Sequence, residues 1–328
     1  MGEVQTVLGA VDAGELGVTL VHEHLQARDE ALAFQFPHLP TTGGEPVREV
    51  DAEGAERLAL EAAQAAVERG VRTICDPAAM FLGRDVRLMR RVSEATGLRI
   101  VAATGIYSYD HLPTALLSRD ADGIADLFVH DLERGIQGTD SRAAFIKCAA
   151  DAPGVTENVE KLHRAAARAS LRTGAPIMAH THPSSRTGLR QLEILTEEGV
   201  DPARVQLAHT GDTADLDYIE RLLDRGAYVG MDRFGLEMFL PFEQRIETVL
   251  ALLERGYAER MMLSADSCAT IDWFPLPVEE QMLAAGAAVD WTIRIVPDKV
   301  LPALRERGMS AEQERTLMVE NPARWLTA

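Results

Sequence analysis

The chain has 328 residues, of which 46% are hydrophobic and 26% charged, the composition of a globular protein with a large core. Asp and Glu number 51 against 33 Lys and Arg, and the formal charge of −18 disfavours binding to nucleic acid or an anionic membrane and favours an uncharged substrate. No basic region followed by an apolar run opens the chain, and no stretch reaches the roughly 18 apolar residues of a membrane span. We therefore expect a soluble, cytoplasmic protein, with residues 1–328 forming one domain.

The three cysteines, Cys75, Cys148 and Cys268, are too few and too widely spaced for a disulfide framework or a cysteine-based zinc site. Each lies in or just after an apolar run, which predicts small buried side chains. Cys268 lies near a candidate ligand, so it could instead line a pocket.

Residues 3–17 predict two short strands around Gly9, a hairpin that would close the bottom of the main fold. Residues 18–24 predict a strand, and because side chains alternate along a strand, His22 and His24 share one face at its carboxyl end. Two adjacent imidazoles suit a metal ion, although such a pair also occurs where a strand merely ends in polar residues. The stretch after His24 is rich in Phe, Pro and Gly and predicts an irregular loop, followed by a helix from about Val50 to Arg69.

One pattern then recurs: a helical segment, a glycine, and a short aliphatic run. A glycine just past a helix adopts the left-handed conformation that other residues disfavour, so the pattern indicates helix ends that lead into buried parallel strands. Residues 215–225 have the matching helical spacing of apolar side chains. Eight strands are predicted, the one at 18–24 and those at 71–76, 98–104, 144–147, 175–180, 204–209, 227–232 and 260–266.

Eight alternating strands and helices predict an α/β fold, a closed (β/α)8 TIM barrel rather than an open doubly wound sheet. No Gly-x-Gly-x-x-Gly motif follows a strand and no phosphate-binding loop with Gly-Lys-Ser/Thr occurs, which disfavours a nucleotide-binding fold. No linker divides the chain. The segment from about Pro297 predicts closing helices packed on the barrel.

In such a barrel the active site lies at the carboxyl ends of the strands. The side chains predicted there are four imidazoles, a carboxylate and a lysine: His22, His24, His180, His209, Asp266 and Lys147. Imidazole and carboxylate are ligands for Zn, Mn, Co or Fe, and a barrel mouth brings together residues far apart in sequence. The strand ends therefore predict a metal site.

Lys147 differs from the others, because an ammonium group beside metal cations is repelled. Burial and nearby positive charge lower the pKa of a lysine, and a neutral amine can take up CO2 to form a carbamate, an anionic bridging ligand. Taken alone, Lys147 could also be a surface lysine at a strand end. The surrounding imidazoles favour the carbamate.

Seven motifs carry a resemblance to the phosphotriesterase family of the amidohydrolase superfamily, most of all to the phosphotriesterase-like lactonases. The resemblance covers nearly the whole chain. Each motif is weak by itself, but the combination is highly specific: Val-His22-Glu-His24, Ile-Lys147-Cys, Ala-His180-Thr-His, Ala-His209-Thr-Gly-Asp, Met-Asp232-Arg233-Phe-Gly, Ser-Ala-Asp266-Ser-Cys and Asn321-Pro322-Ala-Arg.

The resemblance implies a hydrolase with two divalent metal ions, bridged by N6-carboxylated Lys147 and a hydroxide. It assigns His22, His24 and Asp266 to the more buried ion, and His180 and His209 to the more exposed one. The hydroxide would attack the substrate, and Asp266 would take its proton and pass it to the leaving group.

By the same resemblance, Tyr107 would contact a lactone ring and Arg233 would shape the substrate pocket, although Tyr107 and Tyr109 could also simply pack at the barrel rim. The apolar segment 268–277 could hold an acyl chain. The implied activity is a lactonase, acting on N-acyl-homoserine lactones among others as in quorum quenching, with side activity on phosphotriesters, in a homodimer. A dedicated phosphotriesterase is the alternative, and a non-catalytic metal-binding barrel is a more distant one.

Two features depart from the related lactonases. Those enzymes usually carry histidine immediately before the last-strand aspartate, whereas this chain has Ala265, which would leave space or remove a hydrogen bond beside Asp266. The loop after Tyr109 also differs. Of the remaining histidines, His182 is expected to be near the site or in a loop, His163 to be structural in a helix, and three to lie away from the ligand positions: His38, His111 and His130.

Overall fold

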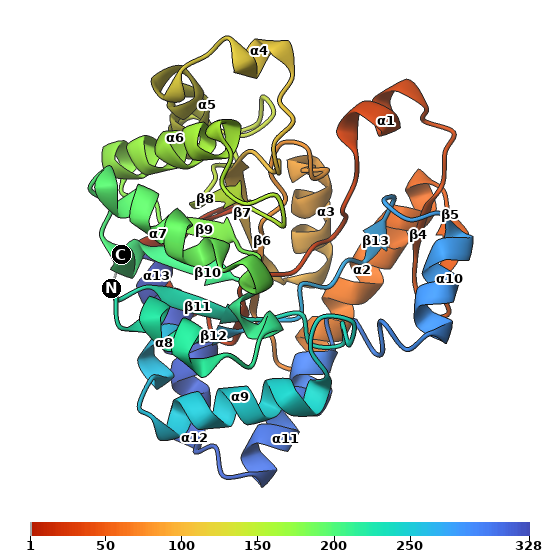
Figure 1. Ribbon diagram of the computed structural model, residues 1–328. Helices are drawn as coiled ribbons and strands as arrows, with labels where there is room; N and C mark the ends of the chain where they lie inside the picture. The colour runs from red at the N-terminus through yellow and green to blue at the C-terminus, as the bar shows by residue number, and fades with distance from the viewer. Residues whose placement is uncertain (1) are drawn as a thin grey trace.

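The computed structural model describes residues 2–328, within which eight strands form one parallel sheet curved into a barrel (Figure 1). Neighbouring strands follow chain order from first to last. The predicted (β/α)8 barrel is confirmed. Its strands are β3 (Thr19–Leu20), β6 (Thr73–Asp76), β7 (Arg99–Gly105), β8 (Phe145–Ala149), β9 (Ile177–His180), β10 (Val205–Ala208), β11 (Tyr228–Met231) and β12 (Met261–Leu263).

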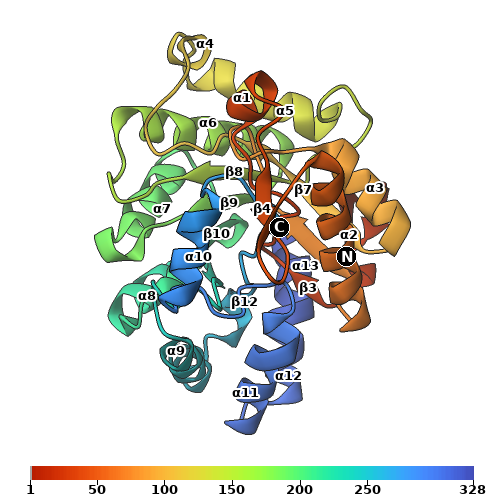
Figure 2. The same cartoon turned by 90° about the vertical axis from the view of Figure 1, so that its right-hand side faces the viewer.

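Helices connect successive strands and surround the barrel (Figures 1 and 2). The glycine pattern predicted their ends correctly where α3 and α6 end, because Gly97 and Gly174 have φ of 73° and 82°, the left-handed conformation. The connecting helices are α2 (Ala52–Glu68), α3 (Val86–Thr96), α4 (Thr114–Leu117), α5 (Ala121–Glu133), α6 (Glu157–Thr173), α7 (Thr187–Glu197), α8 (Leu216–Leu223) and α9 (Phe242–Glu254).

The first and last barrel strands, β3 and β12, are joined by the segments that follow them. The backbone N–H of Asp266 donates to the carbonyl of His22 at 2.9 Å, and the N–H of His24 donates to the carbonyl of Ser267 at 2.8 Å. The seam that closes the barrel therefore passes through the first and the last of the predicted metal ligands.

The amino-terminal hairpin and the carboxyl-terminal helices close the end of the barrel at which the strands begin. Strands β1 (Glu3–Thr6) and β2 (Gly9–Asp12) pair antiparallel, as predicted. Val4 and Leu16 pack with Trp325 in the cluster that fills the barrel interior, where the Trp325 ring lies 5.4 Å from that of Phe145. The predicted closing helices are also confirmed: α11 (Leu301–Glu306), α12 (Ala311–Arg315) and α13 (Asn321–Leu326), with π-helical turns at Val296–Val300 and Thr316–Glu320.

The prediction of an irregular loop after His24 was wrong in part. Helix α1 (Glu30–Gln35) begins where the Asp29 side chain accepts the backbone N–H of Leu32 at 2.7 Å. Farther on, β4 (Thr41–Gly43) pairs with β5 (Arg48–Val50) and with β13 (Thr270–Ile271). Turn-forming residues in this stretch could not indicate the small sheet, because its third strand, β13, lies about 230 residues farther along the chain.

Figure 2 shows β4 and α10 (Leu276–Ala284) in front of the barrel strands, and α1 above the strands in front of α5. Residues 268–277, the apolar segment expected to hold an acyl chain, contain β13 and the start of α10. Among residues 2–328, no helix is both long and apolar enough to cross a membrane.

Candidate active site

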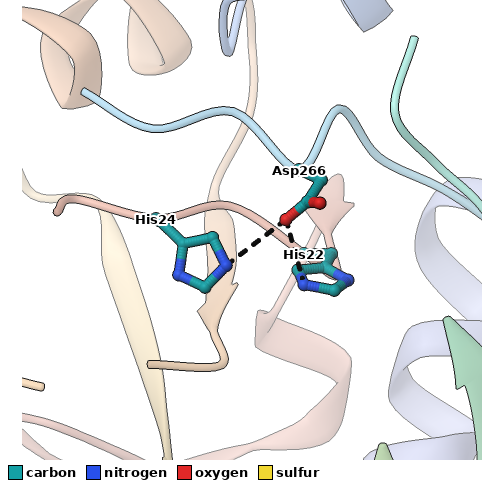
Figure 3. A group of neighbouring side chains, drawn as sticks. All are labelled: His22, His24 and Asp266. Atoms are coloured by element: carbon teal, nitrogen blue, oxygen red, sulfur yellow. Dashed lines mark ion pairs between the residues drawn. The ribbon is translucent and has the colours of Figure 1, made fainter. Parts of the chain in front are cut away.

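Three predicted ligands meet at the barrel seam. The Nε2 atoms of His22 and His24 lie 3.1 Å and 3.3 Å from the same carboxylate oxygen, Oδ1 of Asp266 (Figure 3). The three side chains offer ligand atoms that all lie within 4.8 Å of one another. The strand predicted for residues 18–24 is shorter in the structure, because β3 ends at Leu20, and His22 and His24 lie in the segment that follows it, where His24 forms an isolated bridge with Cys268. The left-handed φ of 53° at Asp266 turns its side chain toward the two imidazoles.

The other three predicted ligands lie beside this group. The ring centroids of His180 and His209 are 4.4 Å apart, and that of His209 is 4.9 Å from that of His22. Lys147 Nζ lies 3.2 Å from His22 Nε2. All six side chains are buried and line one cavity of about 220 Å³ at the carboxyl ends of the strands.

A carboxylate lies behind each imidazole. His180 Nε2 is 2.7 Å from Asp151 and His209 Nδ1 is 2.9 Å from Asp232, while the Nδ1 atoms of His22 and His24 lie 3.3 Å from Asp232 and Asp76, outside good hydrogen-bond geometry. The other nitrogen of each ring therefore faces the centre. Such outer carboxylates fix the orientation and tautomer of metal-binding histidines.

Sequence reasoning missed these carboxylates as participants. Asp76 ends β6 and Asp232 follows β11, so the rule about strand ends could have found both. Asp151 lies two residues beyond β8, where no periodic signal marks it.

Two imidazoles already have the neutral form that metal binding requires, whereas His24 would lose a proton on binding a metal ion: although burial opposes it, hydrogen bonds with Asp266 and Asp76 raise the pKa of His24 to about 9. Burial lowers the pKa of His180 to about 4 and that of His209 well below its usual value, so both rings are neutral at pH 7, the form that binds a metal ion. Burial also lowers the pKa of Lys147 to about 8. Although burial opposes it, the surrounding imidazoles, including the hydrogen bond with His24, and the charge of Arg233 hold the pKa of Asp266 well below its usual range. This donor set fits divalent first-row ions.

Residues 2–326 match the sequence profile of the Phosphotriesterase family. The chain belongs to the phosphotriesterase family. It is 43% identical over 318 residues to the aryldialkylphosphatase of Saccharolobus solfataricus, with 97% of each chain covered, and 40% identical over 331 residues to the phosphotriesterase homology protein of Mycobacterium tuberculosis, covering 99% of this chain and 97% of that one. The solved structure of the phosphotriesterase from M. tuberculosis superposes with a TM-score of 0.90 at 38% identity, over 99% of this chain and 98% of the other.

Membership of the phosphotriesterase family, a family of enzymes with binuclear metal sites, makes this protein a metal-dependent hydrolase. The resemblance seen in the motifs is confirmed. A non-catalytic barrel is not supported.

The mouth of this phosphotriesterase-family site contains aromatic side chains and an arginine, Arg233, that forms ion pairs with two carboxylates. The Tyr107 hydroxyl hydrogen-bonds with that of Tyr109 and lies 3.4 Å from His180 Nδ1, and the Tyr107 ring stacks with Trp273 at 5.9 Å. Arg233 donates from Nε to Asp266 and from Nη1 to Asp212, both at 2.9 Å. Tyr107, Arg233 and Cys268 all line the cavity.

Arg233 is held by a network that sequence reasoning also missed. Its partner Asp212 also accepts from Arg245 at 2.8 Å, and the fully buried Arg245 donates to the backbone carbonyls of Gly211 and Asp232. The network fixes the turn after β11, where Arg233 has a left-handed φ of 59°. Non-glycine residues with positive φ cluster at functional sites.

Two features were expected to depart from the related lactonases, namely Ala265 and the loop after Tyr109. Ala265 is fully buried with the main hydrophobic core, so its side chain belongs to that packing. The loop after Tyr109 leads into α4. Outside the ligand cluster, His182 bonds Ser185 in its own loop at 2.7 Å, and three histidines are exposed, namely His38, His111 and His130.

His163 is structural, as its mid-helix position predicted. Its Nδ1 lies 2.8 Å from the carbonyl of Val159, and Nε2 accepts from Gln191, which also donates to the carbonyl of His180. Burial lowers the pKa of His163 to about 4, below the usual value near 6.5.

We therefore expect stability to fall as the pH is lowered from about 6.5 to 4, because the unfolded chain then binds a proton that the folded His163 does not. The contribution reaches roughly 3 kcal/mol at the acid end. Urea unfolding of the wild type and of His163→Gln across this range should show a smaller pH slope in the variant. Equal slopes would contradict the assignment.

Proposed function

We propose that this protein opens lactone rings bearing an apolar acyl chain, with weaker hydrolysis of aryl phosphotriesters. The observation that supports this most is the composition of the cavity. Its floor is the buried ligand cluster, and its walls are apolar or aromatic: Leu82, Leu236, Met238, Phe239, Phe274 and Met282. The guanidinium of Arg233, which lines the cavity, is neutralised by two carboxylates, so the cavity suits an uncharged substrate.

His22, His24 and Asp266 would hold one divalent ion, His180 and His209 would hold a second, and carboxylated Lys147 would supply a further anionic ligand. When bound, two such ions activate water for attack and polarise the oxygen at the reacting centre. The carboxylate of Asp266 takes up the proton released in the attack and returns it to the leaving oxygen. The Tyr107 hydroxyl, held by Tyr109, donates to the ring oxygen. A homodimer, implied by the resemblance to the lactonases, is part of the same proposal.

A dedicated phosphotriesterase is the second candidate. It is favoured by the name of one relative, an aryldialkylphosphatase that is 43% identical. The same residues would then act at phosphorus instead of a ring carbonyl.

The two candidates differ in the ratio of kcat/KM for a long-chain acyl lactone to kcat/KM for an aryl phosphotriester, measured on one manganese- or cobalt-loaded preparation. We expect a ratio well above one, and a ratio well below one would favour the phosphotriesterase. Tyr107→Phe should lower the lactone value by about tenfold through loss of one hydrogen bond, and the phosphotriester value less. Tyr257→Phe, which removes a hydroxyl bonded to Asp224 outside the cavity, is the matched control.

A further inference from the structure

Glu23 lies between His22 and His24 in the segment just after β3, and its side chain faces away from theirs. Glu23 is only 1% exposed, so its carboxyl group is shielded from solvent. Because neighbouring residues in an extended segment point to opposite faces, His22 and His24 face the cavity and Glu23 faces the segment after β12. An acidic side chain buried in this way requires a full set of hydrogen-bond donors.

Four donors from the last strand segment satisfy the Glu23 carboxylate. Oε1 accepts from the Ser264 hydroxyl at 2.8 Å and the Ala265 N–H at 2.7 Å. Oε2 accepts from the N–H and the hydroxyl of Ser267, at 3.0 Å and 2.5 Å. Each oxygen thus meets two polar groups that can donate to it, the number that a buried carboxyl group needs.

The residue between the two bound backbone amides is Asp266. Its φ of 53° is a left-handed conformation that non-glycine residues rarely adopt and that persists only when surrounding contacts impose it. Glu23 holds the N–H groups on either side of Asp266, and Trp291 Nε1 donates to the Asp266 carbonyl at 3.0 Å. These contacts leave the Asp266 carboxylate directed at His22 and His24 (Figure 3).

We propose that Glu23 is a positioning residue: it binds the backbone around Asp266 across the barrel seam and so aligns this carboxylate with the two histidines for metal binding and proton transfer. The tripeptide His22-Glu23-His24 then supplies two ligands from one face and orients the third ligand from the other. This inference rests on the proposed role of Asp266 as a ligand.

The main test is Glu23→Gln in the cobalt-loaded enzyme. One oxygen can still accept, but the amide NH2 group faces a backbone N–H, so donor opposes donor there even when the neighbouring serine hydroxyl turns to accept, and the turn at Asp266 shifts. We expect release of cobalt to a chelator, followed by visible absorption, to become about tenfold faster, and kcat to fall about 10- to 100-fold with KM little changed.

Ser267→Ala tests the same contact by a smaller change, and it decides the outcome if Glu23→Gln does not fold. It removes one of the four donors and should speed cobalt release and lower kcat in the same direction, by a smaller factor. Ser93→Ala is the matched control, because Ser93 is equally buried, at 4% exposure, and its hydroxyl bonds the Leu98 carbonyl away from the site.

A purely structural role for Glu23 predicts that Ser267→Ala and Ser93→Ala lower the melting temperature alike and leave cobalt release and kcat unchanged. That result would overturn the proposal. Asp266→Asn tests the assignment of Asp266 as a ligand separately from the role of Glu23. If it leaves cobalt release unchanged, the assignment of Asp266 as a ligand fails, and if it speeds release while Glu23→Gln does not, only the role of Glu23 fails.

Discussion

Asp266→Asn is expected to lower kcat/KM by about 10³-fold for every substrate that the wild type hydrolyses. The carboxylate lies within 3.3 Å of Nε2 of both His22 and His24, and its second oxygen accepts from Arg233. An amide keeps the shape but loses the charge that attracts a divalent ion, and it cannot take up a proton. Steady-state kinetics on metal-loaded protein, with the metal content measured for each preparation, would check this.

Asp217→Asn on the outer face of α8 is the control. The chemical change is the same, but Asp217 is exposed and does not line the cavity. It should keep wild-type activity. If Asp266→Asn retained activity within a few fold, the proposed proton transfer would be wrong, whatever its effect on metal content.

The fold was largely predictable from sequence because its signals are local and repeated. Each helix end marked by glycine and each short aliphatic run depends only on nearby residues, and a barrel follows when eight such units occur in succession. The small sheet of β4, β5 and β13 could not be predicted, because Thr42 pairs with Ile271 and no local pattern links them.

In the site too, residues with a local sequence signal could be predicted, and residues that depend on distant contacts could not. His22, His24 and His180 could be predicted from their places at strand ends, and the structure brings them together with the other expected ligands. Glu23 and Asp151 were missed because their importance depends on the donors and rings that they meet across the barrel. Residues that orient the ligands of a metal site do so through contacts across the fold, and the spacing of residues in the sequence does not reveal these contacts.

Lys147→Gln is expected to lower kcat/KM by about 10³-fold and to weaken binding of at least one metal ion by about 10²-fold. Lys147 is buried, its Nζ lies 3.2 Å from His22 Nε2, and no carboxylate in its own strand could replace a bridging anion. Equilibrium dialysis against zinc would measure the affinity. Lys299→Gln, at an exposed lysine, should change neither quantity.

The chemistry of Lys147 can be followed independently of activity. Burial lowers its pKa to about 8, so the fraction of neutral amine able to take up CO2 rises as the pH increases from 7 to 9. Metal-free protein given zinc in buffers equilibrated with the same pressure of 13C-labelled CO2, so that dissolved CO2 is equal at both pH values, should therefore become active faster at pH 9 than at pH 7, and its NMR spectrum should gain a carbamate carbon signal that Lys147→Gln lacks. Full zinc binding without that signal would mean that Lys147 acts as an unmodified amine, and the bridging ligand would have to be sought elsewhere in the site.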